Sequence, residues 1–131
     1  MGKTMKSGFR LEVLMKLRAR RAAACLVQFA AVKQRKGQLE TRWAELQRAC
    51  REVEDRQRQL GSAGTLSVPR LVETRSARQE LKLSHRELRR KQLLVEELVE
   101  LARGSLEQSR KDVQVLQRLR ERRVGTRAAL S

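Results

Sequence analysis

Apolar residues recur at alternating steps of four and three between residues 39 and 60. The positions are Leu39, Trp43, Leu46, Cys50, Val53 and Leu60, with Gln57 in the one gap. This heptad spacing is typical of a helix that buries one narrow stripe against another helix. We call such positions seam positions.

A second stripe with the same spacing follows a glycine-rich break. Its positions are Leu81, Leu88, Val95, Val99, Ala102, Leu106, Val113 and Leu116. If the chain folds back on itself, residues that face each other have numbers with a constant sum. A sum of 131 places apolar seam positions opposite each other, for example Trp43 with Leu88 and Val32 with Val99. The pattern therefore predicts an all-α fold, a single long antiparallel two-helix coiled-coil hairpin.

The limits of this hairpin follow from helix-breaking residues. The break contains two glycines, two serines and Pro69, which are typical of a turn. Ser7 is a candidate cap for the first helix, and Gly125 is a stop signal for the second. We expect a flexible N-terminus over 1–8, a helix over 9–60, a turn over 61–69, a helix over 70–124 and a flexible C-terminus over 125–131.

A two-helix seam needs only one layer of side chains, which suits a chain with only three aromatic residues. Cys25 and Cys50 also occupy seam positions, and we expect them to be small buried apolar residues. They lie about 37 Å apart along one helix, too far for a disulfide. The predicted coiled-coil core is Phe29, Val32, Leu39, Trp43, Leu46, Val53, Leu81, Leu88, Val95, Val99 and Leu106.

The chain is strongly basic, with 31 Lys and Arg against 15 Asp and Glu, a net charge of +16. Residues 1–21 hold seven basic residues and one acidic residue, and residues 110–127 hold seven and two. The hairpin register brings these two segments side by side. The result is a basic end, which favours acidic proteins or polyanions as partners.

A further set of apolar residues lies off the seam. Its members are Leu14, Leu17, Leu94, Leu98, Leu101, Val115 and Leu119. Seam packing does not require them, so an exposed apolar stripe would indicate a protein partner. The alternative is that these residues merely flank and widen the core.

Catalytic and cofactor motifs are absent from the sequence. His85 is the only histidine, and its register opposite Leu46 favours a structural role. No glycine-rich phosphate loop occurs, and one histidine with two distant cysteines is no metal-ligand set. No run of 18 apolar residues exists, and the first 21 residues contain no signal-peptide apolar region. We expect no enzymatic activity, no cofactor, no metal and no membrane-spanning segment.

Two terminal motifs carry a resemblance to a known family. They are FRLEVLMKLR at 9–18 and VQVLQRLRERR at 113–123. Together with a single antiparallel hairpin, they resemble the FliJ family of the bacterial flagellar export apparatus. The YscO family of injectisome stalk proteins is similar. The resemblance covers roughly residues 8–124.

The resemblance implies a non-enzymatic stalk in the pore of a hexameric export ATPase. Such a stalk links the ATPase ring to the membrane protein of the export gate and binds export chaperones. It implies a cytoplasmic protein, peripheral at the inner face of the bacterial membrane. Leu94, Leu98 and Leu101 are then a second partner stripe. The expected ATPase contacts are Arg10, Leu14, Lys16, Leu17, Arg18, Arg20, Arg21, Val115, Arg118, Leu119, Arg120, Arg122 and Arg123.

Two alternatives stay open. One is an injectisome stalk of the YscO type. The other is a basic coiled coil that binds nucleic acid, since neutralisation of phosphates dominates such binding. The sequence favours the second alternative less, because no aromatic residues alternate with the basic ones for base stacking. It would also leave the off-seam leucines unexplained.

Overall fold

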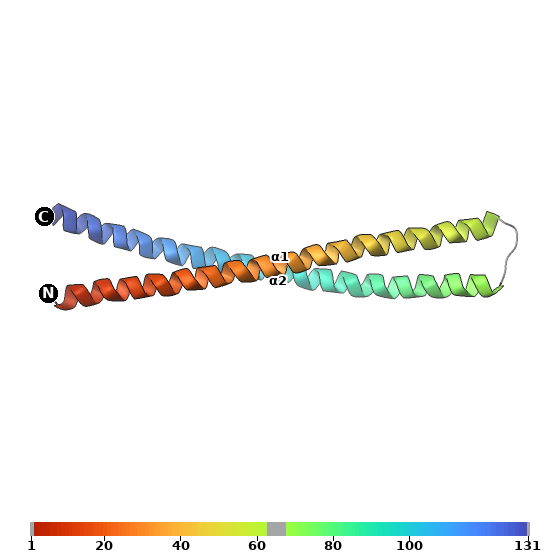
Figure 1. Ribbon diagram of the computed structural model, residues 1–131, viewed down its shortest axis with the longest axis horizontal. Coiled ribbons are helices and arrows are strands. Elements are labelled where there is room, and N and C mark those ends of the chain that lie inside the picture. The colour runs from red at the N-terminus through yellow and green to blue at the C-terminus, as the bar shows by residue number, and fades with distance from the viewer. Residues whose placement is uncertain (1, 63–67, 131) are drawn as a thin grey trace. The chain divides into compact units, whose positions relative to one another are not determined.

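The chain forms two helices that pack against each other in opposite directions (Figure 1). The computed structural model describes the backbone of residues 2–62 and 68–130, and the side chains of residues 8–61 and 68–126. Helix α1 spans Gly2–Ser62 and helix α2 spans Val68–Leu130. The predicted all-α two-helix hairpin is therefore confirmed. Of the predicted turn, residues 63–67 lie outside the described residues.

The helices are longer than the sequence signals indicate. Helix α1 begins at Gly2 rather than residue 9, and α2 continues past Gly125 to Leu130. The segments expected to be flexible are thus helical over 2–8 and 125–130, and Ser7 lies inside α1. One glycine costs a helix only about 1 kcal/mol relative to alanine. That cost does not end a helix whose neighbouring residues favour helix.

The break between the helices is correspondingly shorter than predicted. Gly61 and Ser62 close α1, and Val68 and Pro69 open α2. Proline is tolerated in the first turn of a helix, because the backbone N–H that it lacks has no partner within the helix there. Pro69 therefore lies in the first turn of α2 and not, as predicted, in the turn between the two helices.

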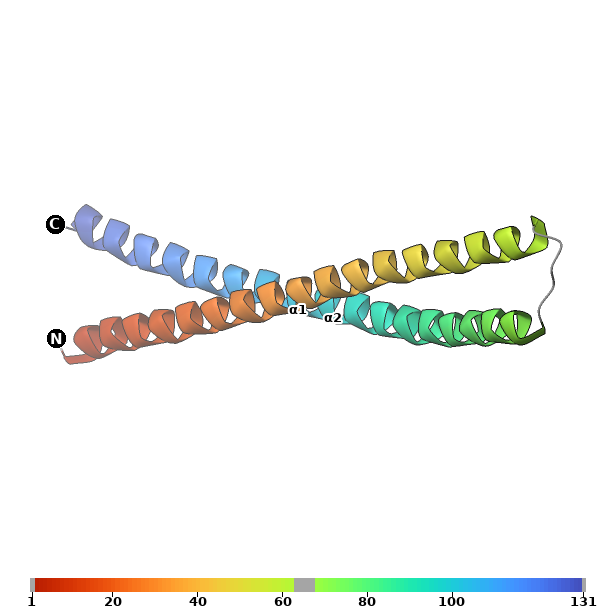
Figure 2. The same cartoon turned by 45° about the vertical axis from the view of Figure 1, so that its right-hand side comes forward.

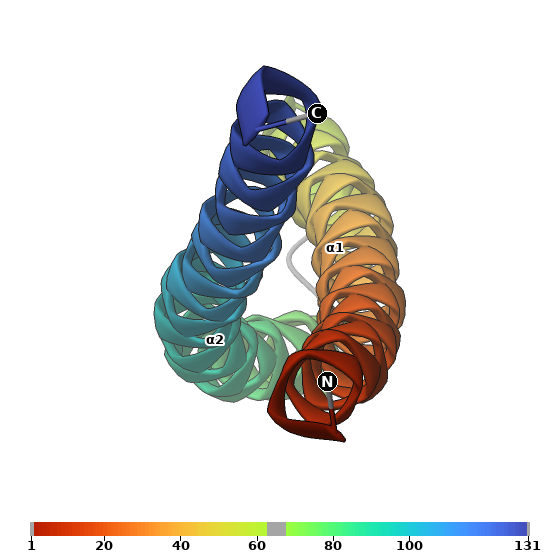
Figure 3. The ribbon, with the colours of Figure 1, turned by 90° about the vertical axis from the view of Figure 1, so that its left-hand side faces the viewer.

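The chain divides into two compact units, each with one segment of either helix. The first unit is Met1–Lys33 with Leu98–Ser131, and the second is Gln34–Glu97. In the first unit α1 and α2 lie antiparallel with their chain ends together, and Figure 3 views that unit from those ends. In the second unit the two helical segments also run in opposite directions (Figure 2).

The core of the second unit is a single layer of side chains. Leu39, Leu88 and Val95 are buried, with 6–9 % of their surface exposed. Trp43 is half-buried, and its ring centroid lies 4.4 Å from that of His85 at an angle of 49°. His85 therefore packs against an aromatic ring of the opposite helix, which fits the structural role expected for it.

The core of the first unit has the same thickness. Leu11, Val99 and Leu106 are buried, and Phe29 is half-buried. Ser109 is also buried, and its hydroxyl donates a hydrogen bond of 2.9 Å to the Leu106 carbonyl. The hydroxyl is thereby satisfied inside α2, so a polar residue at a seam position costs little here.

The burial pattern follows the predicted phase. All fifteen seam positions of α1 between Leu11 and Leu60 are buried or half-buried, and so are twelve of the fifteen on α2. The exposed three are Leu71, Arg78 and Arg120. Contacts across the helices in the first unit, Arg18 with Asp112 and Glu12 with Arg120, have sums of 130 and 132. The structure thus agrees with the register deduced from a sum of 131.

Two expectations about the core need correction. Cys25 and Cys50 are half-buried free thiols rather than buried residues, because a core one layer deep leaves small side chains near water. Leu71, expected opposite Leu60, is 43 % exposed. Its layer is the last one of the predicted seam at that end.

The half-burial of Trp43 sets the size of a stability effect. We expect Trp43→Ala to lower the free energy of unfolding by about 2 kcal/mol. Removal of a fully buried ring typically costs more, about 3–5 kcal/mol. Urea denaturation followed by circular dichroism measures this change. Leu83→Ala is the matched control, because Leu83 is 64 % exposed. An unchanged Trp43→Ala midpoint would place the ring outside the seam.

The register of the first unit can be tested with a native cysteine. A sum of 131 places Cys25 opposite Leu106, so Leu106→Cys in a Cys50→Ser background should give an intrachain crosslink with a short bismaleimide. Val124→Cys in the same background should not react with Cys25. The products are separated by mass spectrometry. A link to residue 124 without one to residue 106 would contradict the register.

Two helical glycines offer a gain in stability. A methyl group added at Gly37 or Gly104 would meet no atom within 4 Å beyond the adjacent residues and the backbone of its own helix. We therefore expect Gly37→Ala and Gly104→Ala each to raise the free energy of unfolding by about 0.5–1 kcal/mol, through helix propensity alone. Thermal melts of the two single variants and of the double variant provide the measurement. A loss of stability at either site would mean that the alanine methyl group is not tolerated there.

Candidate functional site

The seam divides the surface of each unit into two sides. In an antiparallel pair, residues that come just before a seam position lie on one side on both helices, and residues that come just after it lie on the other. Phe29 illustrates the second side. The ammonium of Lys33 lies 5.2 Å from its ring centroid and the guanidinium of Arg103 lies 5.9 Å from it, one cation from each helix. Lys33 and Arg103 each follow a seam position by one residue.

All the predicted off-seam apolar residues come just before a seam position, so they share one side. In the first unit α1 supplies two of them and α2 supplies the rest. They are exposed by 39 % at Leu14 and 55 % at Leu17, and by between 42 % and 68 % on α2. We call this set the leucine face: Leu14, Leu17, Leu98, Leu101, Val115 and Leu119. These side chains keep exposed apolar area beside the core, and its burial against a partner stays a prediction.

Leu94 continues the same spacing on α2 within the second unit. It comes just before Val95 and is 55 % exposed. The predicted second partner stripe of Leu94, Leu98 and Leu101 is therefore solvent-exposed along one helix. Its binding role stays a prediction.

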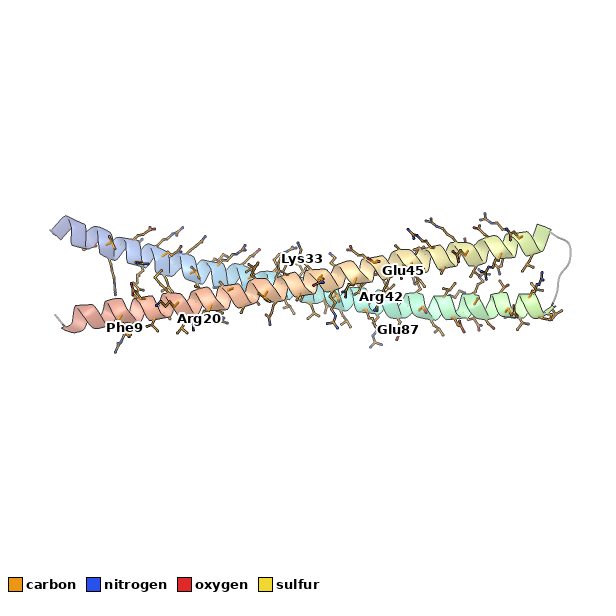
Figure 4. The ribbon with its side chains drawn as sticks, in the orientation of Figure 1. Phe9, Arg20, Lys33, Arg42, Glu45 and Glu87 are labelled. Atoms are coloured by element: carbon orange, nitrogen blue, oxygen red, sulfur yellow. The ribbon has the colours of Figure 1, made fainter. Side chains whose placement is uncertain are left out.

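The predicted basic contacts are distributed unevenly around the leucine face. Arg10 and Arg21 come just before seam positions and lie on its side, and Arg122 joins them when the spacing is continued one step past Arg120 to residue 123. Lys16 follows a seam position and lies on the opposite side. Arg20 projects from α1 away from α2, as Phe9 does (Figure 4). The remaining ones occupy the seam or the outer surface of α2: Arg18, Arg118, Arg120 and Arg123.

Two of the seam arginines lie beside carboxylates of this chain. Arg18 is 3.9 Å from Asp112, and Arg120 is 4.0 Å from Glu12. Both pairs join α1 to α2 within the first unit, with side chains between a third and two thirds exposed. Such exposed pairs contribute only about 0–1 kcal/mol to stability. The two carboxylates neutralise part of the charge of the seam arginines. The positive charge beside the leucine face therefore comes mainly from Arg10, Arg21 and Arg122, which we call its basic rim.

The positive charge of the chain is concentrated in one unit. The first unit has 16 basic and 5 acidic residues, a net charge of +11, whereas the second has 15 and 10, a net charge of +5. The leucine face therefore lies on the more basic part of the chain. An apolar surface with a positive border is suited to bind an apolar surface with a negative border.

The sequence reasoning missed one group of exposed apolar residues. Phe9 is 72 % exposed, Leu26 is 47 % exposed and Val27 is 69 % exposed. For Leu26 and Val27 the available signal was the stretch 22–32, which contains no charged residue although 35 % of the chain is charged. A heptad search assigns part of that stretch to the seam and so hides its outward side chains.

Metal and membrane sites leave no trace in the described part of the chain. Over the described side chains no group of three histidine, cysteine or acidic residues is arranged to hold a metal ion. Neither helix has, within its described residues, a stretch apolar enough to cross a lipid bilayer. The surfaces that the structure brings together are apolar and basic.

Comparison with known proteins adds no relative. No family model, no curated protein and no solved structure matches this chain.

Proposed function

We propose that this protein is a non-enzymatic stalk or adaptor of a bacterial type III protein export apparatus of the flagellar kind. In this role the leucine face of the first unit contacts the hexameric export ATPase. The supporting observation is that Leu14 and Leu17 of α1 share one side with Val115 and Leu119 of α2. Neither helix alone presents this surface.

The chemistry of the leucine face fits a subunit ring. Apolar side chains that are 39–68 % exposed in the free chain still have surface to bury against a partner. Arg10, Arg21 and Arg122 on the same side would attract acidic residues of the ring before contact. A domain only two helices thick also suits insertion into a narrow pore.

The proposal extends to the other partners of such a stalk. Leu94, Leu98 and Leu101 form an exposed stripe along α2 that overlaps the leucine face at Leu98 and Leu101. We assign this stripe to the membrane protein of the export gate or to export chaperones. The protein would then work in the cytoplasm, peripheral at the inner face of the membrane. An injectisome stalk of the YscO type would use the same surfaces with a different ATPase.

Binding of nucleic acid is the second candidate, and the net charge of +11 on the first unit favours it. Phosphate binding depends on lysine and arginine and falls steeply with salt. Binding of nucleic acid would give no role to Leu14, Leu17, Val115 or Leu119. The two functions therefore differ in whether those four side chains matter.

A binding titration against the purified flagellar export ATPase at low and high salt tests the proposal. Replacing Leu14, Leu17, Val115 and Leu119 together by glutamine should weaken binding by at least about tenfold at both salt concentrations, because apolar burial is not screened. Replacing Arg10, Arg21 and Arg122 by glutamate should weaken it mainly at low salt.

The matched control replaces Leu83 and Leu93, which are 64 % and 49 % exposed and lie off the leucine face, by glutamine. This variant should bind like the unchanged chain, and all variants should keep their helicity by circular dichroism. Equal losses in the control would remove the role of the leucine face. Salt-sensitive binding to duplex DNA that ignores the four glutamines, without ATPase binding, would favour the nucleic-acid function instead.

A further inference from the structure

Two successive layers of the seam are underfilled in the second unit. In one of them Val53 faces Arg78, but Arg78 is exposed, so α2 places no buried side chain opposite Val53. In the next layer Leu81 faces Cys50, whose side chain is smaller than a leucine. Because the core is only one side chain deep, no second layer of residues fills the space that is left.

A cavity of 340 Å³ lies at these layers, and we call it the seam cavity. Its apolar lining comes from Cys50 and Val53 of α1 and from Leu81 of α2, and His85 adds an aromatic ring. The volume is at the lower end of the about 300–1,000 Å³ that is typical of small-molecule sites. The seam cavity therefore has room for a small ligand.

Charged residues lie at the mouth of the seam cavity. Arg78, Lys82 and Arg86 of α2 line it together with Glu54 of α1. Among the described residues no ion pair involves any of these four side chains. The three cations are therefore not held by a carboxylate of this chain. Because Glu54, Lys82 and Arg86 each follow a seam position, the cavity opens on that side.

The two sides of the seam differ in charge over this part of the second unit. Next to the seam positions of 43–60 and 71–88, three basic and five acidic residues come just before a seam position, among them Glu45 and Glu87 (Figure 4). On the side where the cavity opens, the basic residues are Arg51, Arg58, Arg75, Lys82, Arg86 and Arg89, and the acidic one is Glu54. An anion at the mouth would therefore meet a predominantly positive surface.

His85 gives the seam cavity a flat wall. Its ring packs on that of Trp43, with the centroids 4.4 Å apart and the planes at 49°, and it also lines the cavity. The contact with Trp43 holds the imidazole in place. An aromatic ligand would therefore meet a preformed surface on which it can pack.

We propose that the seam cavity binds a small aromatic acid. Its ring system would fill the space beside Cys50 and Val53, which removes apolar surface from water. Its acid group would lie at the mouth, near Arg78, Lys82 and Arg86. This inference does not rest on the proposed function, because the leucine face lies in the first unit and the seam cavity in the second.

Two other kinds of ligand fit the seam cavity less well. An acidic helix or a long acyl chain would extend beyond it, because its lining comes only from residues 50–54 of α1 and 78–86 of α2. Nucleic acid would be attracted by the same cations, but its phosphates would leave the apolar lining unused. An apolar lining with a basic mouth favours a compact aromatic anion.

Isothermal titration calorimetry of the full chain with 2-naphthoate tests the proposal. The ligand control is 2-naphthamide, which is neutral and has nearly the same shape. The naphthoate should bind at least about fivefold more tightly, because only the acid is attracted by the basic mouth. Equal affinities of the two ligands, or no binding of the naphthoate, would overturn the proposal.

The two native thiols report where the ligand binds. Cys50 lines the seam cavity and Cys25 lies in the first unit, and both are half-buried free thiols. Saturating naphthoate should protect Cys50 from alkylation by iodoacetamide and leave Cys25 as reactive as before, as mass spectrometry of the products shows. Equal protection of both thiols, or of neither, would overturn the proposal.

Filling the seam cavity is a test by substitution. Cys50→Leu should reduce the affinity for the naphthoate by at least about tenfold, because the added side chain takes the place of the ring system. Leucine suits a seam position, so helicity by circular dichroism should be kept. Cys25→Leu is the matched control in the first unit and should leave the affinity unchanged. Retained affinity in a folded Cys50→Leu variant would overturn the proposal.

The role of the cations is tested by replacing Lys82 and Arg86 together by glutamine. This variant should bind the naphthoate at least about fivefold more weakly. The matched control replaces Arg48 and Arg90, which lie two residues from the nearest seam positions and so on the outer surface, by glutamine. It removes the same charge and should leave the affinity unchanged. An equal loss in this control would indicate general attraction of anions and would overturn the proposal.

Discussion

Burial of one layer of side chains along the seam is the interaction on which the rest of the structure depends. A helix in water owes most of its stability to the packing of its apolar stripe rather than to intrinsic propensity. Leu39 and Val95 in the second unit, and Val99 and Leu106 in the first, are among the most buried residues of the chain. The seam also determines which side of the hairpin every other residue occupies, and so it places the residues of the leucine face together.

Much of the fold could be predicted from the sequence, because a coiled coil is specified by spacing alone. The ends of the helices could not, since one glycine or serine is a weak local signal against a cooperative helix. Gly125 illustrates this point, as α2 continues past it. The exposure of Leu71 was also missed, because periodicity carries no information about where the last layer loses its cover.

The candidate site was only partly predictable for a related reason. Leu14 and Val115 were found because they interrupt a polar side of the heptad pattern. Lys16 was grouped with Arg10 by its charge, although the two residues lie on opposite sides of the seam. Leu26 and Val27 escaped notice because their stretch also contributes to the seam, so their outward exposure required the register itself.

The thinness of the core has a consequence for motion. Over the described residues no large side chain is fully buried, so every core residue lies close to water. Separating one layer exposes little apolar area, and its cost is correspondingly a small part of the cost of unfolding the unit. The two helices can therefore open locally while the neighbouring layers stay closed. A partner bound beside such a layer would therefore shift the balance between its closed and open forms.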